Sequence, residues 1–366
     1  MTQLNRLQLQ AFRNAENLSC RLSSGMNLFI GDNAAGKTSL IEAIWLLATG
    51  RSFRSRQITH LIQHQHTETV IFAELQSHLE PQQTYRIGMQ RSVQKMTLRL
   101  NGENVRAQSE IAQQLPVQLL TPESHRLLEE GPKARRQFID WGCFYQFPEF
   151  ISLWRQHKRL LKQRNHALKK RLPAMQIQLW DAQLVETSLQ IDQLRRQYLE
   201  FLMPFIEQYC QALMPELEQA INSSYRAGWP KSAESLQQLM HDNLHNDIQK
   251  GHTQYGAHRA DVRFKFGTFE ALQALSRGQQ KLFVCALMLA QAQLHQQVTN
   301  EPSIMLIDDL PAELDHFHRD KLMQLLSDLK IQHIVTSTAQ DLIPITNPKN
   351  AQAWQIENGV LKPLQI

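Results

Sequence analysis

The sequence predicts an α/β domain that is interrupted by a long, mostly helical insertion. Short apolar runs bounded by turn residues occur near both ends of the chain, at Met26–Ile30 and Ile304–Ile307, and such runs are typical of buried strands. Between about residues 148 and 240 the pattern changes to long helical periods rich in Gln, Leu and Arg. The chain has 366 residues, more than one core usually holds, so two lobes are expected.

Residues 1–120 are expected to form the first half of the α/β domain. The apolar strand at 26–30 is followed by a helical pattern over residues 37–48. Asn101-Gly102 predicts a tight hairpin turn. Further strands are expected at 69–75, 84–89 and 96–100, with a return from the turn through Val105.

Residues 121–254 are expected to form the insertion, and residues 255–366 the second half of the α/β domain. Apolar residues of the insertion recur at spacings that keep them near one helical face, namely Leu184, Ile191, Leu194, Tyr198 and Leu202. In the last part the expected elements are a helix near 277–296 and strands at 262–266, 304–307 and 333–336.

Residues 31–38 match the phosphate-binding pattern G-x-x-x-x-G-K-[ST] between a strand and a helix. Backbone N–H groups at such a helix start attract phosphate oxygens, and the glycines allow turn geometry without a Cβ clash. Lys37 is expected near the β and γ phosphates, and the Thr38 hydroxyl at Mg²⁺. The alternative is a chance match in a glycine-containing turn. We expect ATP to contact Gly31, Asp32, Asn33, Ala34, Ala35, Gly36, Lys37 and Thr38.

Two carboxylates follow the apolar strand at 304–307. At the carboxyl end of a parallel strand, Asp308 can reach Mg²⁺ from the side opposite Thr38. Asp309 then points toward a water in line with the γ-phosphate and is the candidate general base. The alternative is an ordinary exit from a strand, where Asp is common.

The segment Leu275-Ser-Arg-Gly-Gln-Gln280 opens a helix, with Ser276 as its N-cap. Gly278 keeps the backbone N–H groups accessible. By itself the segment is a capped helix. The segment follows the phosphate loop and the insertion and precedes the paired aspartates by about thirty residues. This order favours a role in nucleotide binding over a simple helix cap.

In this order the segments resemble the ABC-type ATPase heads shared with SMC proteins, and among them the bacterial DNA-repair members. The resemblance covers nearly the whole chain. Besides the phosphate loop, the matching segments are 12–14, 50–55, 121–123, 135–140, 258–261, 275–281 and 308–315.

The resemblance implies roles for particular residues. Ser276, Gly278 and Gln279 match the signature motif, which in such heads caps the γ-phosphate bound by a second subunit, and residues 312–315 match the loop that crosses the dimer interface. Arg51, Arg54 and Arg56 fall where related heads place an arginine near the γ-phosphate or DNA, the alternative being a solvated basic loop. The residues expected to take part in catalysis are Lys37, Ser276 and Asp309.

Three departures from the family pattern matter, and the last two of them suggest slow ATP hydrolysis. Arg277 replaces the first glycine of the common transporter signature. Asp309 stands where most such heads carry a glutamate, which leaves Glu313 as another candidate base. Thr336-Ser-Thr338 follows the strand after which transporters place a histidine. We therefore expect a weak, DNA-stimulated ATPase in which ATP acts as a timer.

The charge distribution predicts a local polyanion site. The formal net charge is +5, yet residues 151–171 contain eight basic residues and no acidic one. Within this block, Lys158, Arg159 and Lys162 are the expected DNA contacts. The alternative is that these charges only solvate the insertion.

The composition favours a soluble, cytoplasmic protein. Residues 1–14 lack the features of a signal peptide, and the longest nearly apolar run, 282–290, is too short to cross a bilayer. No paired cysteine spacing suggests zinc or redox chemistry. The four cysteines, expected to be buried and reduced, are Cys20, Cys143, Cys210 and Cys285.

The resemblance implies an ATP-dependent DNA-binding protein of recombinational repair, replication and the SOS response to DNA damage. ATP is expected to hold two copies of the chain together on DNA at single-strand gaps or duplex junctions, and hydrolysis to release them. RecO and RecR are the implied partners in loading RecA. The alternatives are the ATPase subunit of a membrane transporter, against which the long basic insertion argues, and a P-loop kinase, which does not need the segment at Ser276.

Overall fold

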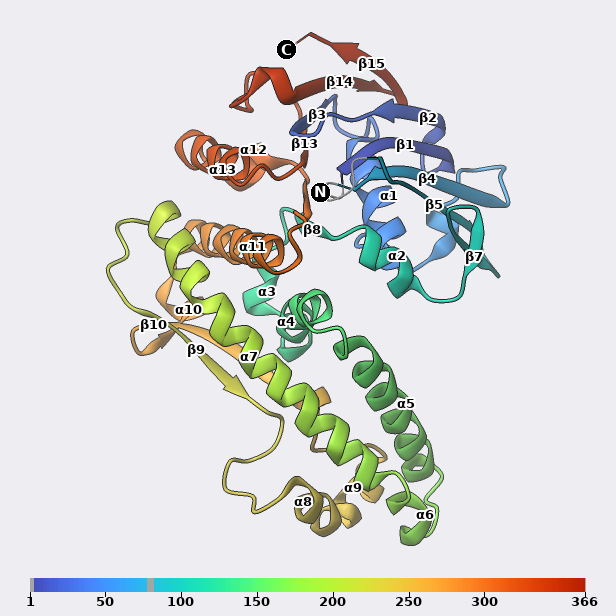
Figure 1. Cartoon of the computed structure of the whole chain (residues 1–366), viewed down its shortest axis with the longest axis vertical. Helices are drawn as coiled ribbons and strands as arrows, with labels where there is room; N and C mark the ends of the chain where they lie inside the picture. Colours follow the sequence, from blue (N-terminus) through green and yellow to red (C-terminus); the bar gives the residue numbers. More distant parts are fainter. Residues whose placement is uncertain (1–2, 78–81, 366) are drawn as a thin grey trace. The chain divides into compact units, whose positions relative to one another are not determined.

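The computed structural model describes residues 3–77 and 82–365, which form two compact units (Figure 1). The head unit contains Met1–His125, Tyr209–Met214 and Lys281–Ile366, and the arm unit contains Arg126–Gln208 and Pro215–Gln280. These units are defined by contacts. The lobe boundaries at residues 120 and 254 remain a prediction from the sequence.

The head unit contains a six-stranded, mostly parallel sheet with the order β15-β14-β3-β13-β12-β8. Only β15 runs antiparallel to its neighbour. β3, β12 and β13 are buried at every position, which explains the apolar residues at most positions of β3 and β12. The strands are β3 (Met26–Ile30), β8 (Val117–Leu120), β12 (Ile304–Ile307), β13 (His333–Ser337), β14 (Ala351–Glu357) and β15 (Val360–Leu364).

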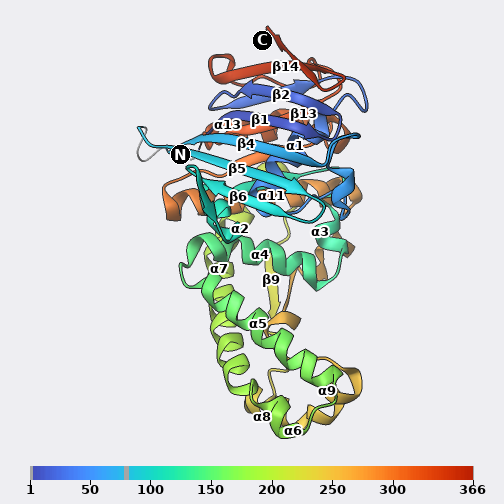
Figure 2. The same ribbon diagram turned by 90° about the vertical axis from the view of Figure 1, so that its right-hand side faces the viewer.

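The second sheet of the head unit is antiparallel, with the order β2-β1-β4-β5-β6-β7 (Figure 2). Burial alternates along β4, as expected for a sheet with one face on the core. Asn101 and Gly102 have φ values of 52° and 88°, so the predicted hairpin turn is confirmed. The strands are β1 (Gln3–Phe12), β2 (Ala15–Arg21), β4 (Glu68–Gln76), β5 (Thr84–Ser92), β6 (Met96–Leu100) and β7 (Glu103–Val105).

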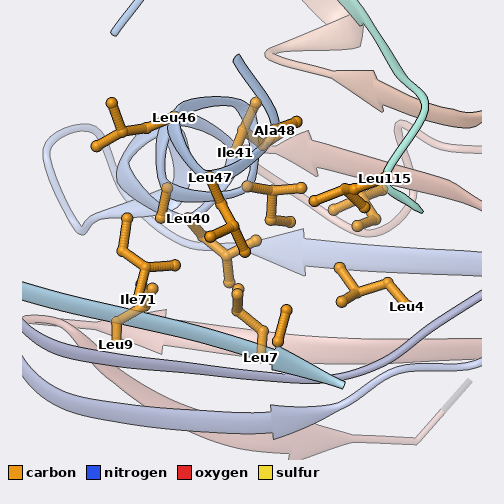
Figure 3. Close-up of a cluster of buried hydrophobic side chains, with 14 of the residues drawn as sticks. Leu4, Leu7, Leu9, Leu40, Ile41, Leu46, Leu47, Ala48, Ile71 and Leu115 are labelled. Carbon is orange, nitrogen blue, oxygen red and sulfur yellow. The ribbon is translucent and has the colours of Figure 1, made fainter. Parts of the chain in front are cut away.

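Helix α1 (Lys37–Thr49) joins both sheets in one hydrophobic core. Figure 3 shows its residues Leu40 and Leu47 beside Leu7 and Leu9 of β1. The helix ends at Gly50, whose left-handed φ of 71° suits glycine. The other helical segments of the head are η1 (Ile58–His60), α2 (Gln108–Gln114), α12 (Leu310–Glu313), α13 (His316–Asp328), η3 (Pro348–Asn350) and most of α11 (Arg277–Thr299).

The arm unit is mostly helical. Its longest helix, α7 (Asp181–Leu213), buries the five apolar residues predicted to share one face, so that prediction is confirmed. The other helical segments are α3 (Arg126–Glu129), α4 (Pro132–Gln146), α5 (Phe150–Lys169), α6 (Ala174–Gln178), α8 (Leu236–Asp242), α9 (Leu244–Lys250), η2 (Ala257–Arg259) and α10 (Ala271–Ala274).

One predicted strand lies in a different sheet from the one we expected. β10 (Asp261–Phe266) does not extend the head, because it pairs with β9 (Ile221–Arg226) and β11 (Phe269–Glu270) in a three-stranded sheet of the arm unit. The sequence did not reveal β9, whose residues are mostly polar and only partly buried. This strand, which we expected in the second half of the head, therefore belongs to the sheet of the arm unit.

Within residues 3–77 and 82–365, no helix combines the length and apolar character needed to cross a bilayer. The four cysteines are buried, as the sequence predicted, and in the described chain they are thiols, not disulfides. Burial raises the pKa of the Cys20 thiol to about 12, so this thiol remains protonated at neutral pH.

Candidate nucleotide-binding site

A polar cavity of about 450 Å³ lies in the head unit where α1 begins, beside the carboxyl end of β12. Ligand sites of parallel α/β sheets occupy this position because strand ends and helix N-termini meet there. The residues that line it are Arg13, Asn14, Asn33, Ala34, Gly36, Lys37, Thr38, Ser39, Arg54, His60, Ile62, Asp308 and Asp309.

The phosphate loop has the tight geometry that its glycines predict. A Cβ on Gly31 would lie 2.4 Å from the Ile356 carbonyl oxygen, which leaves no room for a side chain. Gly36 has a φ of 117°, which L side chains rarely adopt. Gly31, Asp32 and Ala35 do not line the cavity, and Ala35 N–H donates to the Asp32 carbonyl at 3.2 Å. These three residues shape the loop, while its other members face the cavity.

Lys37 is positioned by the loop itself. Its side chain is buried, and Nζ donates to the carbonyl oxygens of Gly31 at 2.5 Å and Asp32 at 2.9 Å. Burial lowers the pKa of this amine, and the charges of Asp309 and Asp308 act in the opposite direction. The two carbonyl oxygens compensate the positive charge of Lys37 only in part. A phosphate bound in the cavity would compensate the rest.

The structure brings Thr38 and Asp308 together at the cavity. Thr38 Oγ1 donates to Asp308 Oδ1 at 3.0 Å. Asp308 is buried, and burial raises the pKa of its carboxyl. A hydroxyl and one carboxylate are hard oxygen donors, and Mg²⁺ usually takes one or two protein oxygens together with phosphate and water. This pair therefore fits Mg²⁺.

Thr336 is a member of the site that sequence analysis missed. Its buried hydroxyl donates to Asp308 Oδ1 at 2.8 Å and accepts the Asp309 N–H at 2.8 Å. Asp309 has left-handed backbone angles, φ 52° and ψ 54°, which are unfavourable for a residue other than glycine. The Thr336 hydroxyl thus stabilises this conformation. The parallel pairing of Ile307 with Val335 places the next residues, Asp308 and Thr336, side by side, and this register is visible only in the folded chain.

The three arginines predicted near the γ-phosphate or DNA differ in position. Arg54 lines the cavity, whereas Arg51 and Arg56 are exposed and do not. Arg13 and Asn14, for which the sequence analysis gave no role, also line it. Asn14 Nδ2 donates to the Ala35 carbonyl at 3.1 Å, which ties the turn between β1 and β2 to the phosphate loop.

The signature segment lies in the arm unit, whereas we expected it in the second half of the head, and Ser276 caps helix α11 as predicted. Ser276 Oγ accepts the Gln279 N–H at 3.3 Å, and Gln279 Oε1 accepts the Ser276 N–H at 3.0 Å, which is a reciprocal capping box. Ser276 and Gly278 are exposed. Asp315 caps α13 by accepting the His318 N–H at 2.9 Å. The side chains of Ala312 and Glu313, where we placed an interface loop and another candidate base, lie outside the described residues.

The basic block lies on α5 and the turn after it, and one of its members is not a surface charge. Arg164 is fully buried and binds Asp181 and Asp247 at 2.6 Å each. Arg164, one of the eight basic residues of the block, therefore contributes no charge to the surface. Lys158, Arg159 and Lys162 are exposed, and in the described chain no ion pair engages them. Lys158 Nζ lies 4.7 Å from the centre of the Trp154 ring.

Two sheets around one helix, a phosphate loop and an adjacent carboxylate define an ATPase head of the ABC and SMC class. The model of the RecF/RecN/SMC N-terminal domain family matches residues 3–360. The chain belongs to this family and, within it, to the RecF proteins.

The similarity to RecF extends over whole chains. The chain is 58% identical to the DNA replication and repair protein RecF of Hydrogenovibrio crunogenus over 99% of both proteins, and 41% identical to that of Shewanella loihica over 97% and 98%. A solved structure titled RecF-ATP in the RecFOR pathway matches with a TM-score of 0.88, 23% identity and coverage of 99% and 98%. An Smc head domain from Pyrococcus furiosus matches with a TM-score of 0.59, 16% identity and coverage of 100% and 96%. These matches do not favour the transporter alternative.

Proposed function

We propose that the protein binds ATP in the head unit and uses it to control DNA binding in recombinational repair and replication. The cavity beside α1 carries this proposal, because Lys37, Thr38 and Asp308 provide a cation, a hydroxyl and a carboxylate at one phosphate loop. The relatives named as DNA replication and repair proteins, and the RecF structure titled with ATP, support it.

In this proposal the loop amides and Lys37 hold the β and γ phosphates of ATP. Thr38 would hold Mg²⁺ directly and Asp308 from its outer shell, and the ion would neutralise phosphate charge. Asp309, at the wall of the cavity, is the proposed general base for an attacking water. Its side chain is shorter than that of the family's usual glutamate, so it must approach the water more closely. The proposed hydrolysis is therefore slow, which suits ATP as a timer, and the resemblance to related heads is the reason to propose that DNA stimulates it.

The signature segment is the proposed contact with a second copy of the chain. Beyond its neighbours and its own helix, a Cβ on Gly278 would meet no atom of the described residues within 4 Å, so internal packing does not require glycine there. A glycine near the start of α11 leaves its N–H groups open to a close ligand. Ser276, Gly278 and Gln279 would therefore cap the γ-phosphate held by the other copy, with residues 312–315 at the same interface.

The exposed lysines and arginine of α5 are the proposed DNA contacts on the arm unit. Lys158, Arg159 and Lys162 present charge at helical intervals, which suits a phosphate backbone and needs no base contacts. Arg51 and Arg56, exposed on the head unit, are the second candidates. The proposed targets are duplex DNA and its junctions with single strands. The proposed protein partners are RecR, RecO and RecA, and the proposed location is the cytoplasm.

Equilibrium DNA binding with ATP, with ADP and without nucleotide tests this proposal. We expect tighter binding to duplex and gapped DNA with ATP than in the other two conditions, and no ATP effect in Lys37→Ala. Equal affinities in the three conditions for the unaltered protein would contradict nucleotide control of DNA binding. Lys95→Ala, which removes an exposed lysine of the head away from the cavity, is the control.

A further inference from the structure

A buried carboxylate on α1, that of Glu42, lies behind the cavity and has no role in the function proposed above. Glu42 comes about one helical turn after Thr38 and is fully buried, like its neighbours Ile41 and Ala43. Removing a carboxylate from water is costly unless cations and hydrogen-bond donors compensate for it. The partners of Glu42 therefore indicate why an acid is present at this position.

Three side chains donate hydrogen bonds to the Glu42 carboxylate. Two of them, Arg13 and Ser52, are enough to occupy both of its oxygens. Arg13 binds both oxygens, with Nε 2.9 Å from Oε2 and Nη2 2.6 Å from Oε1. The Ser52 hydroxyl makes a short hydrogen bond to Oε1. Arg54 Nη1 is 3.5 Å from Oε2, the longest of these contacts. Glu42 would thus remain paired if Arg54 moved away.

The two arginines differ in freedom although both line the cavity. The Arg13 side chain is 17% exposed, and its backbone N–H donates to the Leu61 carbonyl at 2.9 Å. The Arg54 side chain is 44% exposed and touches Glu42 at one point. Ser52 Oγ accepts the Arg54 N–H at 2.9 Å, so the backbone of Arg54 is held while its guanidinium can turn.

We propose that Glu42 is a positioning residue, which holds Arg13 permanently and releases Arg54 to the terminal phosphate of a bound nucleoside triphosphate. This inference rests on the proposed ATP site. A terminal phosphate carries more charge than a carboxylate and accepts two parallel hydrogen bonds from a guanidinium. A diphosphate lacks that group, so Arg54 stays with Glu42. Leaving Glu42 costs Arg54 part of what it gains at the terminal phosphate, so the pairing limits how strongly the site prefers ATP over ADP.

The test compares the ratio of ADP to ATP dissociation constants in four proteins by calorimetry: the unaltered chain, Arg54→Ala, Glu42→Gln and the double variant. Arg54→Ala should weaken ATP binding about tenfold or more and change ADP binding by less than about twofold. Glu42→Gln should raise the ATP preference at least about threefold, because Arg54 then reaches the terminal phosphate without first leaving a carboxylate. In the Arg54→Ala background, Glu42→Gln should change the ratio by less than about twofold.

Several outcomes would overturn the inference. An unchanged ratio in Arg54→Ala, or equal effects of Glu42→Gln with and without Arg54, would mean that Glu42 does not act through Arg54. A lower melting temperature of Glu42→Gln with an unchanged ratio of ADP to ATP dissociation constants would show that Glu42 has a purely structural role. Arg54→Ala needs no change in the core, so it remains informative if Glu42→Gln does not fold. Arg21→Ala, an exposed arginine on β2, is the control. Absence of ATP binding to the unaltered chain would instead contradict the proposed function.

Discussion

The nucleotide cavity of the head unit and the basic surface of the arm unit both depend on charged side chains, but they hold them differently. In the cavity, Lys37 and Asp308 are buried and already bonded to neighbouring groups of the protein. On α5, Arg159 and Lys162 are exposed, and no ion pair of the described chain fixes them. Contacts within the protein thus fix the charged side chains of the cavity, whereas on α5 only the backbone of the helix sets where the charges lie.

Helix α5 contains both kinds of charge within two turns. Arg164 is fully buried between Asp181 and Asp247, while Arg159 and Lys162 remain in water. Basic residues that look equivalent in a sequence can therefore have opposite roles. Burial predicts a large effect on folding for one and on polyanion binding for the others, and substitutions can separate these effects.

The largest expected effect is on stability, from Arg164→Ala. This change leaves two buried carboxylates without their shared cation and should cost about 3–5 kcal/mol of unfolding free energy. Arg159→Ala, its matched control on the same helix, should change stability by less than about 0.5 kcal/mol. Urea-induced unfolding followed by circular dichroism measures both. Similar losses in the two variants would remove the distinction between buried and exposed charges on α5.

Lys37→Ala should have the next largest effect, on ATP affinity. Charged hydrogen bonds contribute about 1.5–3 kcal/mol each, so binding should weaken by about ten- to hundredfold. Calorimetric titration with ATP measures this change. Lys349→Ala, on the exposed η3 segment, should bind ATP normally. Normal ATP binding by Lys37→Ala would mean that the phosphate loop is not the nucleotide site.

Thr336→Val should have a smaller effect because it keeps the side-chain shape and removes two hydrogen bonds. We expect a loss of about 1–3 kcal/mol in stability and slower ATP hydrolysis that needs more Mg²⁺, since Asp308 and Asp309 lose a shared partner. Ser337→Ala removes a buried hydroxyl that bonds the Ala339 carbonyl and is the control. If the two variants require the same Mg²⁺ concentration, Thr336 does not position the metal carboxylate.

The substitutions with the smallest expected effect on stability are those on the exposed face of α5, and they should clearly weaken DNA binding. Changing Lys158, Arg159 and Lys162 together to Gln should alter stability by less than about 0.5 kcal/mol. The slope of log affinity against log salt should flatten by about 2–3 units on every DNA sequence. A control triple, Arg21, Arg86 and Arg99 to Gln, removes the same charge from the head unit. Equal slopes in the two triples would show that α5 makes no phosphate contacts.

Sequence patterns predicted the elements whose cause is local. The phosphate loop follows from its glycines and its strand-to-helix setting, and the turn at Asn101 follows from two residues that tolerate positive φ. The buried strands β3 and β12 follow from continuous apolar runs. In each case a short stretch of sequence contains the physical reason for the structure.

What the sequence did not predict depends on partners far away in the chain. β9 is polar, and only pairing with β10 makes it a strand. Thr336 joins the site through a residue 28 positions away, and Arg164 binds an acid 83 positions away. No local pattern distinguishes such residues from their neighbours, because burial and pairing arise only in the folded chain.

The mass of the protein in solution with ATP, with ADP and without nucleotide tests the central claim most directly. Multi-angle light scattering after size exclusion, with Mg²⁺ and with or without duplex DNA, should show a dimer only with ATP. Ser276→Arg, which adds bulk and charge where the second copy's phosphates would lie, should bind ATP as a monomer and not dimerise. A monomer of the unaltered protein in all conditions, or an ATP-dependent dimer that survives Ser276→Arg, would contradict the account.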